Sequence, residues 1–288
     1  MKYILGTAQF GSSYGVNNTR GMPSENDIYS ILNTAYDNDI VFLDTASSYG
    51  DSERTIGKFI EITGKHFNIC SKYSGKHDPL QELNKTLKMF STEKLYLYYL
   101  HRFSDCKNTS ITNAMIRFRS KGIIEKTGIS IYSPDELYYI LDNCGVMFNV
   151  IQIPFSIIDC NRWVNPIKKA NEKGMTIFCR SILLQGALLK KRDDKFIKKY
   201  QAEGIVDSIN DLCIRYNCTK NELAFNFCNS FDEISGILFG CETLAQLEDN
   251  VDILGRSICF SKHERQHIMN QFKDIGSSFI DPRQWKTV

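Results

Sequence analysis

The sequence predicts an α/β protein with a single (β/α)8 barrel domain over residues 1–288. Eight short apolar runs rich in β-branched and aromatic residues recur along the chain, and longer stretches with helical spacing of apolar residues separate them. Strand–helix alternation repeated eight times in a chain of this length indicates parallel strands closed into a barrel. The expected strands are Tyr3–Thr7, Val41–Asp44, Phe67–Lys72, Leu95–His101, Thr127–Tyr132, Asn149–Pro154, Thr176–Arg180 and Gly236–Gly240.

Helix boundaries are visible in several of the intervening stretches. Ser24 precedes an acidic turn, and Ser133 is followed by Pro134, so both positions indicate helix starts. Gly122 and Gly174 follow helical stretches, where glycine commonly ends a helix. The apolar stripes of three expected helices are Ile28, Ile31, Leu32 and Ala35; Leu80, Leu83, Leu87 and Phe90; and Ile111, Ala114, Met115 and Phe118.

An open doubly wound sheet is the competing fold. That fold carries a glycine-rich turn after its first strand, but residues 6–11 read Gly-Thr-Ala-Gln-Phe-Gly and do not fit G-x-G-x-x-G. The chain shows no low-complexity tract and no change of composition that would mark a linker. We expect irregular structure in the connection Leu183–Asp194 and in the C-terminal tail, residues 275–288.

The composition is that of an ordinary globular protein. Hydrophobic residues make up 42% of the chain and charged residues 24%, and the formal net charge is +2. Such a small charge favours neither nucleic acid nor an anionic membrane as a partner. The ten cysteines form no C-x-x-C, and several lie in apolar runs, which is typical of reduced, buried thiols. Without an apolar signal or membrane-spanning run, we expect a cytoplasmic protein.

Polar residues at the ends of the expected strands form the candidate functional site. Asp44, Lys72 and His101 end three successive strands, and Tyr49 follows Asp44 after five residues. The C-terminal ends of barrel strands surround one mouth, so these four side chains should meet there. Three further strands end at or near Ser130, Gln152 and Arg180.

The four residues suit proton transfer to oxygen. A tyrosine holds its proton to a pH of about 10, and a nearby ammonium favours the phenolate. A buried ammonium in turn needs a carboxylate to keep its charge. Asp44, Lys72 and Tyr49 would therefore form a relay, and His101 would hydrogen-bond and orient a carbonyl oxygen. This chemistry requires neither a nucleophile nor a metal.

Over residues 3–255 the sequence resembles the aldo-keto reductase superfamily. The similarity implies a barrel that binds a nicotinamide dinucleotide and passes hydride to an aldehyde or ketone, with Tyr49 protonating the oxygen. The motifs that carry it, in the family's order, are Gly6-Thr7-Ala8, Asp44-Thr45-Ala46-x-x-Tyr49-Gly50-x-Ser52-Glu53-x-x-Ile56-Gly57, Ser71-Lys72, Leu100-His101, Gly128-Ile129-Ser130, Gln152 and Gly240…Gln246-Leu247-x-x-Asn250.

The resemblance also implies which residues bind the cofactor. It places the family's catalytic tetrad on Asp44, Tyr49, Lys72 and His101. NADP(H) is the favoured cofactor, NAD(H) is the alternative, and no metal is expected. The cofactor-binding candidates are Thr7, Ala8, Asp44, Ser130, Gln152, Arg180, Gly240, Thr243, Gln246 and Asn250.

The sequence departs from the family pattern in four places. The usual Ser-Asn pair is Ser130-Ile131, and Cys179 or Arg180 stands where a tyrosine usually stacks on the nicotinamide. Glu242 lies among positions that often bind a 2′-phosphate. No segment precedes Tyr3 for the hairpin that often closes the bottom of the barrel, so side chains alone should close it. Arg180 is expected to contact either a cofactor phosphate or an acidic group of the substrate.

Other residues allow more than one interpretation. Phe10, Phe103 and Tyr132 lie at or after strand ends and are candidate substrate contacts. Residues 263–267 read H-E-x-x-H, a possible zinc motif, but Ser261 and Glu264 also fit a capping box, which explains the glutamate structurally. Trp285 could fold over the mouth or belong to a loose tail.

The sequence therefore predicts an NAD(P)H-dependent enzyme that reduces a small carbonyl compound, with sugars among the candidate substrates. Two alternatives remain: a catalytically silent, nucleotide-binding barrel that acts as a regulatory subunit, and a sugar-modifying enzyme that keeps NAD(H) tightly bound. The sequence does not distinguish the substrate, because pocket loops vary freely in this fold.

Overall fold

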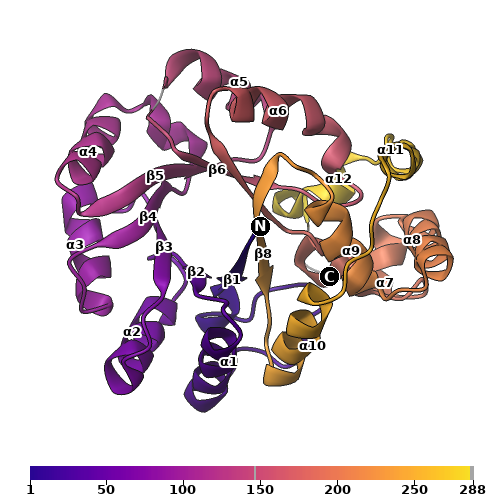
Figure 1. Ribbon diagram of the computed structural model, residues 1–288, viewed down its shortest axis with the longest axis horizontal. Helices are drawn as coiled ribbons and strands as arrows, with labels where there is room; N and C mark the ends of the chain where they lie inside the picture. The colour runs from indigo at the N-terminus through magenta and orange to yellow at the C-terminus, as the bar shows by residue number, and fades with distance from the viewer. Residues whose placement is uncertain (146, 286–288) are drawn as a thin grey trace.

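The computed structural model describes residues 1–145 and 147–285 and confirms the predicted (β/α)8 barrel. Eight parallel strands close in sequence order, β1 pairing with both β2 and β8, and the helices surround them (Figure 1). The strands are β1 (Lys2–Gly6), β2 (Phe42–Asp44), β3 (Asn68–Tyr73), β4 (Leu95–Leu100), β5 (Ile124–Ser130), β6 (Val150–Pro154), β7 (Thr176–Arg180) and β8 (Ile234–Gly240).

Most helices begin at residues that cap them. Capping boxes begin α1, α5, α9 and α11, and Asp78 and Asn108 accept backbone N–H groups at the starts of α3 and α4. The helices are α1 (Glu25–Asp37), α2 (Ser52–Thr63), α3 (Pro79–Met89), α4 (Thr109–Ser120), α5 (Pro134–Asn143), α6 (Val164–Glu172), α7 (Lys195–Lys199), α8 (Glu203–Tyr216), α9 (Lys220–Asn229), α10 (Leu244–Leu254), α11 (Lys262–Gln271) and α12 (Ser277–Ile280).

Short 3-10 helices follow several strands at the mouth of the barrel. They are η1 (Ala8–Phe10), η2 (Phe103–Lys107), η3 (Cys160–Arg162) and η4 (Leu184–Leu189), and a fifth 3-10 helix, η5 (Pro282–Gln284), follows α12. The connection Leu183–Asp194, expected to be irregular, therefore contains a 3-10 helix. The strand β5 also begins three residues earlier than predicted. Glu125 and Lys126 are polar and gave no strand signal in the sequence, yet Lys126 pairs with Leu97 of β4.

The core has two layers. Inside the barrel, seven buried side chains form one cluster: Ile4, Cys70, Leu97, Tyr99, Val150, Phe178 and Leu238. A larger cluster lies between the strands and the helices. At the bottom of the barrel the Phe42 and Tyr96 rings meet edge to face at 5.1 Å, and the Lys126 ammonium donates to the Tyr96 hydroxyl at 3.0 Å. Side chains thus close the end at which the N-terminus lies.

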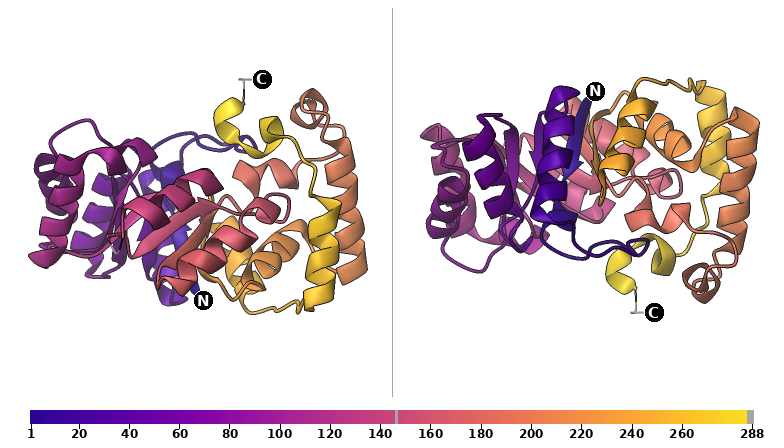
Figure 2. Two further views of the ribbon diagram at one scale, coloured as in Figure 1. Left: turned by 90° about the horizontal axis from the view of Figure 1, so that it is seen from above. Right: turned by 90° about the horizontal axis from the view of Figure 1, so that it is seen from below.

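The described part of the C-terminal tail, residues 275–285, contains two short helices where irregular structure was expected. The helix α12 and η5 lie at the end of the barrel opposite the N-terminus (Figure 2). Trp285 packs against Phe196 at a centroid distance of 4.8 Å, and its indole N–H donates to the Phe279 carbonyl at 3.0 Å. Residues 286–288 of the predicted tail lie outside the described residues.

Candidate active site

Four adjacent elements bring the predicted tetrad to one side of the mouth. Asp44 is the last residue of β2, Lys72 lies in β3, and His101 directly follows β4. Tyr49 lies in the turn between β2 and α2. Parallel pairing, with Asp44 opposite Cys70 and Lys72 opposite Tyr99, brings the C-terminal ends of these strands to the same mouth, which is why residues far apart in the sequence converge.

Lys72 is the centre of this group. Its ammonium donates to Asp44 Oδ1 and, at 2.8 Å, to the Thr45 carbonyl, and it lies 3.4 Å from the Tyr49 hydroxyl. The Lys72 side chain is 1% exposed and that of Asp44 6% exposed, so this is a buried ion pair. Gln152 Nε2 donates to Asp44 Oδ2 at 2.7 Å and thereby satisfies the other carboxylate oxygen.

The Tyr49 turn is held against the loop after β1. The backbone of Gly11 lies so close to Tyr49 that a Cβ at this position would lie 1.8 Å from the Tyr49 carbonyl oxygen. Only glycine fits this approach. Thr7, the first residue of the same loop, binds the Asp44 carbonyl with both its N–H (2.9 Å) and its hydroxyl (3.1 Å). These contacts fix Asp44 and Tyr49 relative to each other.

Burial and neighbouring charges set the protonation states. Burial opposes the charge on Lys72, but Asp44 and Tyr49 together raise its pKa above the ordinary value. Burial raises the pKa of Tyr49, and the Lys72 ammonium offsets this only in part. Burial, with help from Lys72 and Arg180, lowers the pKa of His101 to about 3. At neutral pH the site therefore holds a charged lysine, a protonated phenol and a neutral imidazole.

An open cavity of about 1300 Å³, counting the space at its mouth, lies over the tetrad. Its lining includes Asp44, Tyr49 and His101, while Lys72 lies behind Asp44 and Tyr49 and is not part of the lining. Tyr132, predicted as a substrate contact, also lines the cavity. Of the predicted cofactor-binding residues, the lining contains Thr7, Ala8, Asp44, Ser130, Gln152, Arg180, Gly240, Gln246 and Asn250.

Three predicted residues lie elsewhere. Phe10 is 1% exposed and packs in the core between strands and helices. Phe103 packs edge to face on Tyr139 of α5 at 5.4 Å and does not line the cavity. Thr243 caps α10, where its hydroxyl accepts the Gln246 N–H at 3.2 Å. An aromatic residue near a strand end can turn outward to the helices, and sequence position alone does not exclude this.

The structure shows which of Cys179 and Arg180, at the end of β7, faces the cavity. Cys179 is fully buried, whereas Arg180 lines the cavity. The following residues, Ser181, Leu184 and Gln185, have φ of 61°, 50° and 54°, a conformation that side chains other than glycine rarely adopt. Such strain is typical of functional loops, and Ser181 and Gln185 both line the cavity.

Sequence reasoning missed several lining residues because they lie in loops and at helix starts. They carry no strand-end signal, and only the closed barrel brings them together. They include Gln9, Asn17, Ser181, Gln185, Asn221 and Asp249. Asn221 is the most informative of them, because its Oδ1 is buried without a hydrogen-bond partner in the described part of the chain. A buried acceptor of this kind at a cavity indicates a ligand-binding group.

The H-E-x-x-H segment serves a structural role. Glu264 accepts the Ser261 N–H at 2.9 Å, and the Ser261 hydroxyl accepts the Glu264 N–H at 3.1 Å, which completes the capping box of α11. Among residues 1–145 and 147–285, no group of three or more His, Cys, Asp or Glu side chains is arranged to hold a metal ion. Nor does that part of the chain contain a helix long and apolar enough to span a membrane.

The fold and the site together define a (β/α)8 barrel with a buried tyrosine–lysine–aspartate group beneath an open cavity. The chain belongs to the aldo/keto reductase family, whose family model matches residues 2–270. Proteins of this family are oxidoreductases that act on small carbonyl substrates with nicotinamide cofactors.

Individual relatives are distant. The chain is 25% identical to the aldo-keto reductase str7 of Strobilurus tenacellus over 279 residues, covering 86% of this chain and 81% of that protein. It is 22% identical to the chloroplastic pyridoxal reductase of Arabidopsis thaliana over 268 residues, covering 80% and 73%. The holo form of the aldo-keto reductase AKR11C1 from Bacillus halodurans superimposes with a TM-score of 0.71 at 19% identity, covering 99% of this chain and 95% of that chain. The last similarity shows the fold alone.

Proposed function

We propose that the protein reduces an aldehyde or ketone to an alcohol with a nicotinamide cofactor, and that Tyr49 is the general acid. The observation that carries this proposal is the buried Lys72, which binds Asp44 and lies 3.4 Å from the Tyr49 hydroxyl beside the cavity. The Lys72 side chain is 1% exposed, so its ammonium is not a hydrated surface charge. Its position is suited to stabilising a phenolate.

Each residue of the tetrad has a distinct part in the proposed step. Tyr49 donates its proton to the carbonyl oxygen as that oxygen gains negative charge. Lys72 stabilises the resulting phenolate, and Asp44 keeps the lysine charged in a buried position. His101 stays neutral at physiological pH, so it can orient the carbonyl oxygen by a hydrogen bond without adding a charge.

The extent of the cavity supports the proposal of a dinucleotide cofactor. A bound nicotinamide cofactor supplies the hydride, and the cavity extends from the tetrad to the start of α10. We assign Ser130 and Gln152, at the ends of β5 and β6, to the nicotinamide end because they lie opposite each other in the sheet and Gln152 donates to Asp44 of the tetrad. Asn250 and the unpartnered Oδ1 of Asn221 are assigned to the other end.

The charges near α10 favour NAD(H) in place of the NADP(H) expected from the resemblance. Glu242 and Asp249 line this part of the cavity, and Arg180 is the only arginine or lysine in the described lining. A 2′-phosphate beside two carboxylates would be repelled, whereas a ribose hydroxyl can donate to Glu242. We expect NADH to bind at least about tenfold more tightly than NADPH, measured by fluorescence titration.

The charge-reversing variant Glu242→Lys provides the matching control for that titration. The dissociation constants of NADH and NADPH should become more similar in this variant, or NADPH should bind more tightly, because the lysine would attract the 2′-phosphate. Tighter binding of NADPH by the wild-type protein would restore the original expectation.

Replacing Tyr49 with phenylalanine tests the proposed acid. Loss of the proton donor should lower kcat by about 10²- to 10⁴-fold, while the dissociation constant of NADH stays within about threefold. The assay follows NADH oxidation over a panel of aldehydes, ketones and sugars. Tyr96→Phe is the matched control, because it removes a tyrosine hydroxyl at the bottom of the barrel.

The same assay separates the alternative functions. A Tyr49→Phe variant that keeps the wild-type rate would remove Tyr49 from the acid role. Cofactor binding without turnover of any carbonyl would favour the silent nucleotide-binding barrel. Turnover without added cofactor, with NAD(H) bound to the purified protein, would identify a sugar-modifying enzyme.

A further inference from the structure

Arg180 is a cation at the cavity that pairs with no carboxylate in the described part of the chain. It is the last residue of β7 and lines the cavity, and it forms no ion pair with any of the described residues. Its Nη2 donates to the Ile131 carbonyl at 3.2 Å and its Nη1 to the Ser181 hydroxyl at 3.3 Å. A guanidinium has five N–H donors in a planar fork, so three of them remain available.

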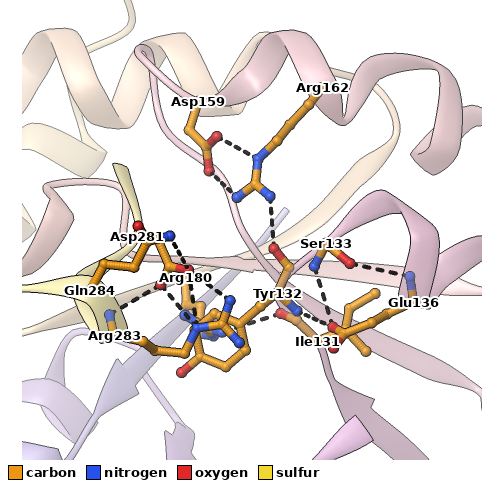
Figure 3. A network of polar contacts seen from close by, with 10 residues as sticks. All are labelled: Ile131, Tyr132, Ser133, Glu136, Asp159, Arg162, Arg180, Asp281, Arg283 and Gln284. Carbon is orange, nitrogen blue, oxygen red and sulfur yellow. Dashed lines mark hydrogen bonds and ion pairs between the residues drawn. The ribbon is translucent and has the colours of Figure 1, made fainter. Parts of the chain in front are cut away.

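A fixed aromatic ring supports this guanidinium. Arg180 Cζ lies 4.2 Å from the centroid of the Tyr132 ring, and Arg283 Cζ of the C-terminal segment lies 3.8 Å from the same centroid (Figure 3). The Tyr132 backbone is held on both sides, since its N–H donates to Glu136 at 2.6 Å and its carbonyl accepts from Arg162 at 2.8 Å. Arg180 is therefore oriented before any ligand binds, which reduces the entropic cost of binding.

The charges around the tetrad do not balance. Lys72 is neutralised by Asp44, and His101 is uncharged because its pKa is lowered to about 3. Arg180 thus leaves one positive charge on the catalytic side of the cavity. By contrast, the other arginines around Tyr132 have partners: Arg162 binds Asp159 at 2.6 Å and Arg283 binds Asp281 at 2.7 Å.

We propose that Arg180 is a specificity-determining residue that binds a carboxylate carried by the carbonyl substrate. The substrate class is then an aldehyde or ketone that also bears an acid group, held with its carbonyl at Tyr49. This inference rests on the proposed function. A planar carboxylate matches the two-pronged geometry of a guanidinium, and the Ser181 hydroxyl beside Arg180 offers a further contact to the same group.

Two nearly isosteric aldehydes test the proposal. The holoenzyme with NADH is assayed with 4-carboxybenzaldehyde, which is anionic, and with 4-formylbenzamide, which is neutral. We expect the ratio of their kcat/KM values to favour the acid in the wild-type protein. In Arg180→Gln this ratio should fall by about 10- to 100-fold, the loss expected for hydrogen bonds to a charged group.

Arg192→Gln is the matched control. Arg192 is an exposed arginine that is paired with Asp207 and does not line the cavity. In this variant the ratio should remain that of the wild type. An equal fall of the ratio in both variants would indicate a general effect of net charge and would overturn the proposal.

Binding measurements separate failure of this inference from failure of the proposed function. Calorimetry with the unreactive analogues 4-carbamoylbenzoate and terephthalamide needs no turnover, and the wild-type protein should bind the carboxylate more tightly. The preference should be lost in Arg180→Gln, even if neither aldehyde is reduced. An unchanged preference in Arg180→Gln would overturn the assignment. Loss of NADH affinity in Arg180→Gln, with an unchanged ratio of the two kcat/KM values, would indicate that Arg180 binds a cofactor phosphate. This result would also overturn the proposal.

Discussion

At the residue scale, the site depends on one buried ion pair and one uncharged histidine. Lys72 could be predicted to meet Asp44 and Tyr49, because each lies at or soon after the end of a neighbouring strand. The protonation states could not be predicted, since they follow from burial. The pKa of Tyr49 is raised in spite of Lys72, and that of His101 is lowered to about 3. The phenol is thus kept protonated, as a general acid must be before it reacts.

The lowered pKa of His101 predicts a pH-dependent stability. In the unfolded chain the imidazole binds a proton below a pH of about 6.5, whereas the folded protein binds it only near 3. The unfolded state therefore binds more protons between these values, so the free energy of unfolding falls as the pH falls. Between pH 6.5 and 5 this residue alone should account for a loss of roughly 2 kcal/mol.

Urea unfolding of the wild-type protein and of His101→Gln at both pH values measures this contribution. Between pH 6.5 and 5 the free energy of unfolding of His101→Gln should fall by roughly 2 kcal/mol less than that of the wild-type protein. His66→Gln is the control, because it removes a histidine that lies outside the cavity. Parallel pH dependence in the wild-type protein and His101→Gln would show that the imidazole titrates normally in the fold.

At the element scale, strands were predictable where they are apolar and less so where polar residues interrupt them. The run Leu95–Leu100 was evident, whereas the first residues of β5 were missed because Glu125 and Lys126 resemble a loop. Phe10 and Phe103 show that a position after a strand end does not predict the direction of a side chain. Both follow strand ends, yet neither lines the cavity, because a side chain's direction depends on the helix that packs against it.

Close packing between α2 and α3 provides a test at this scale. A Cβ at Gly57 would lie 1.7 Å from the Met89 carbonyl oxygen, which is backbone and cannot move aside. Gly57→Ala should therefore lower the free energy of unfolding by about 3 kcal/mol. Gly204→Ala in α8, where a Cβ meets no atom within 4 Å, should raise it by about 0.5 kcal/mol.

Chemical denaturation of both glycine variants checks this pair. A stable Gly57→Ala variant would show that the two helices can separate without cost. A destabilised Gly204→Ala variant would show that the alanine preference of the helix does not apply at this position.

At the scale of the whole molecule, closing the barrel turns separate strand ends into one site. The mouth also receives the C-terminal segment, whose Arg283 reaches the Tyr132 ring, while the N-terminus lies at the opposite end (Figure 2). The order of the strands was predictable from the alternation of the sequence. The placement of α12 and Trp285 was not predictable from the sequence. It depends on the contacts of Trp285 with α7 and with Phe279 of α12, which no local pattern encodes.

The barrel, its cavity and the buried lysine support the proposed reaction, transfer of hydride to a carbonyl carbon with Tyr49 protonating the oxygen. Reduction with NADH carrying deuterium at both C4 positions tests this directly, with mass spectrometry of the alcohol product. The wild-type protein should place one deuterium on the carbinol carbon, and Tyr49→Phe should form almost none of this product. An alcohol without deuterium, or equal deuterium transfer by both proteins, would contradict the proposed reaction.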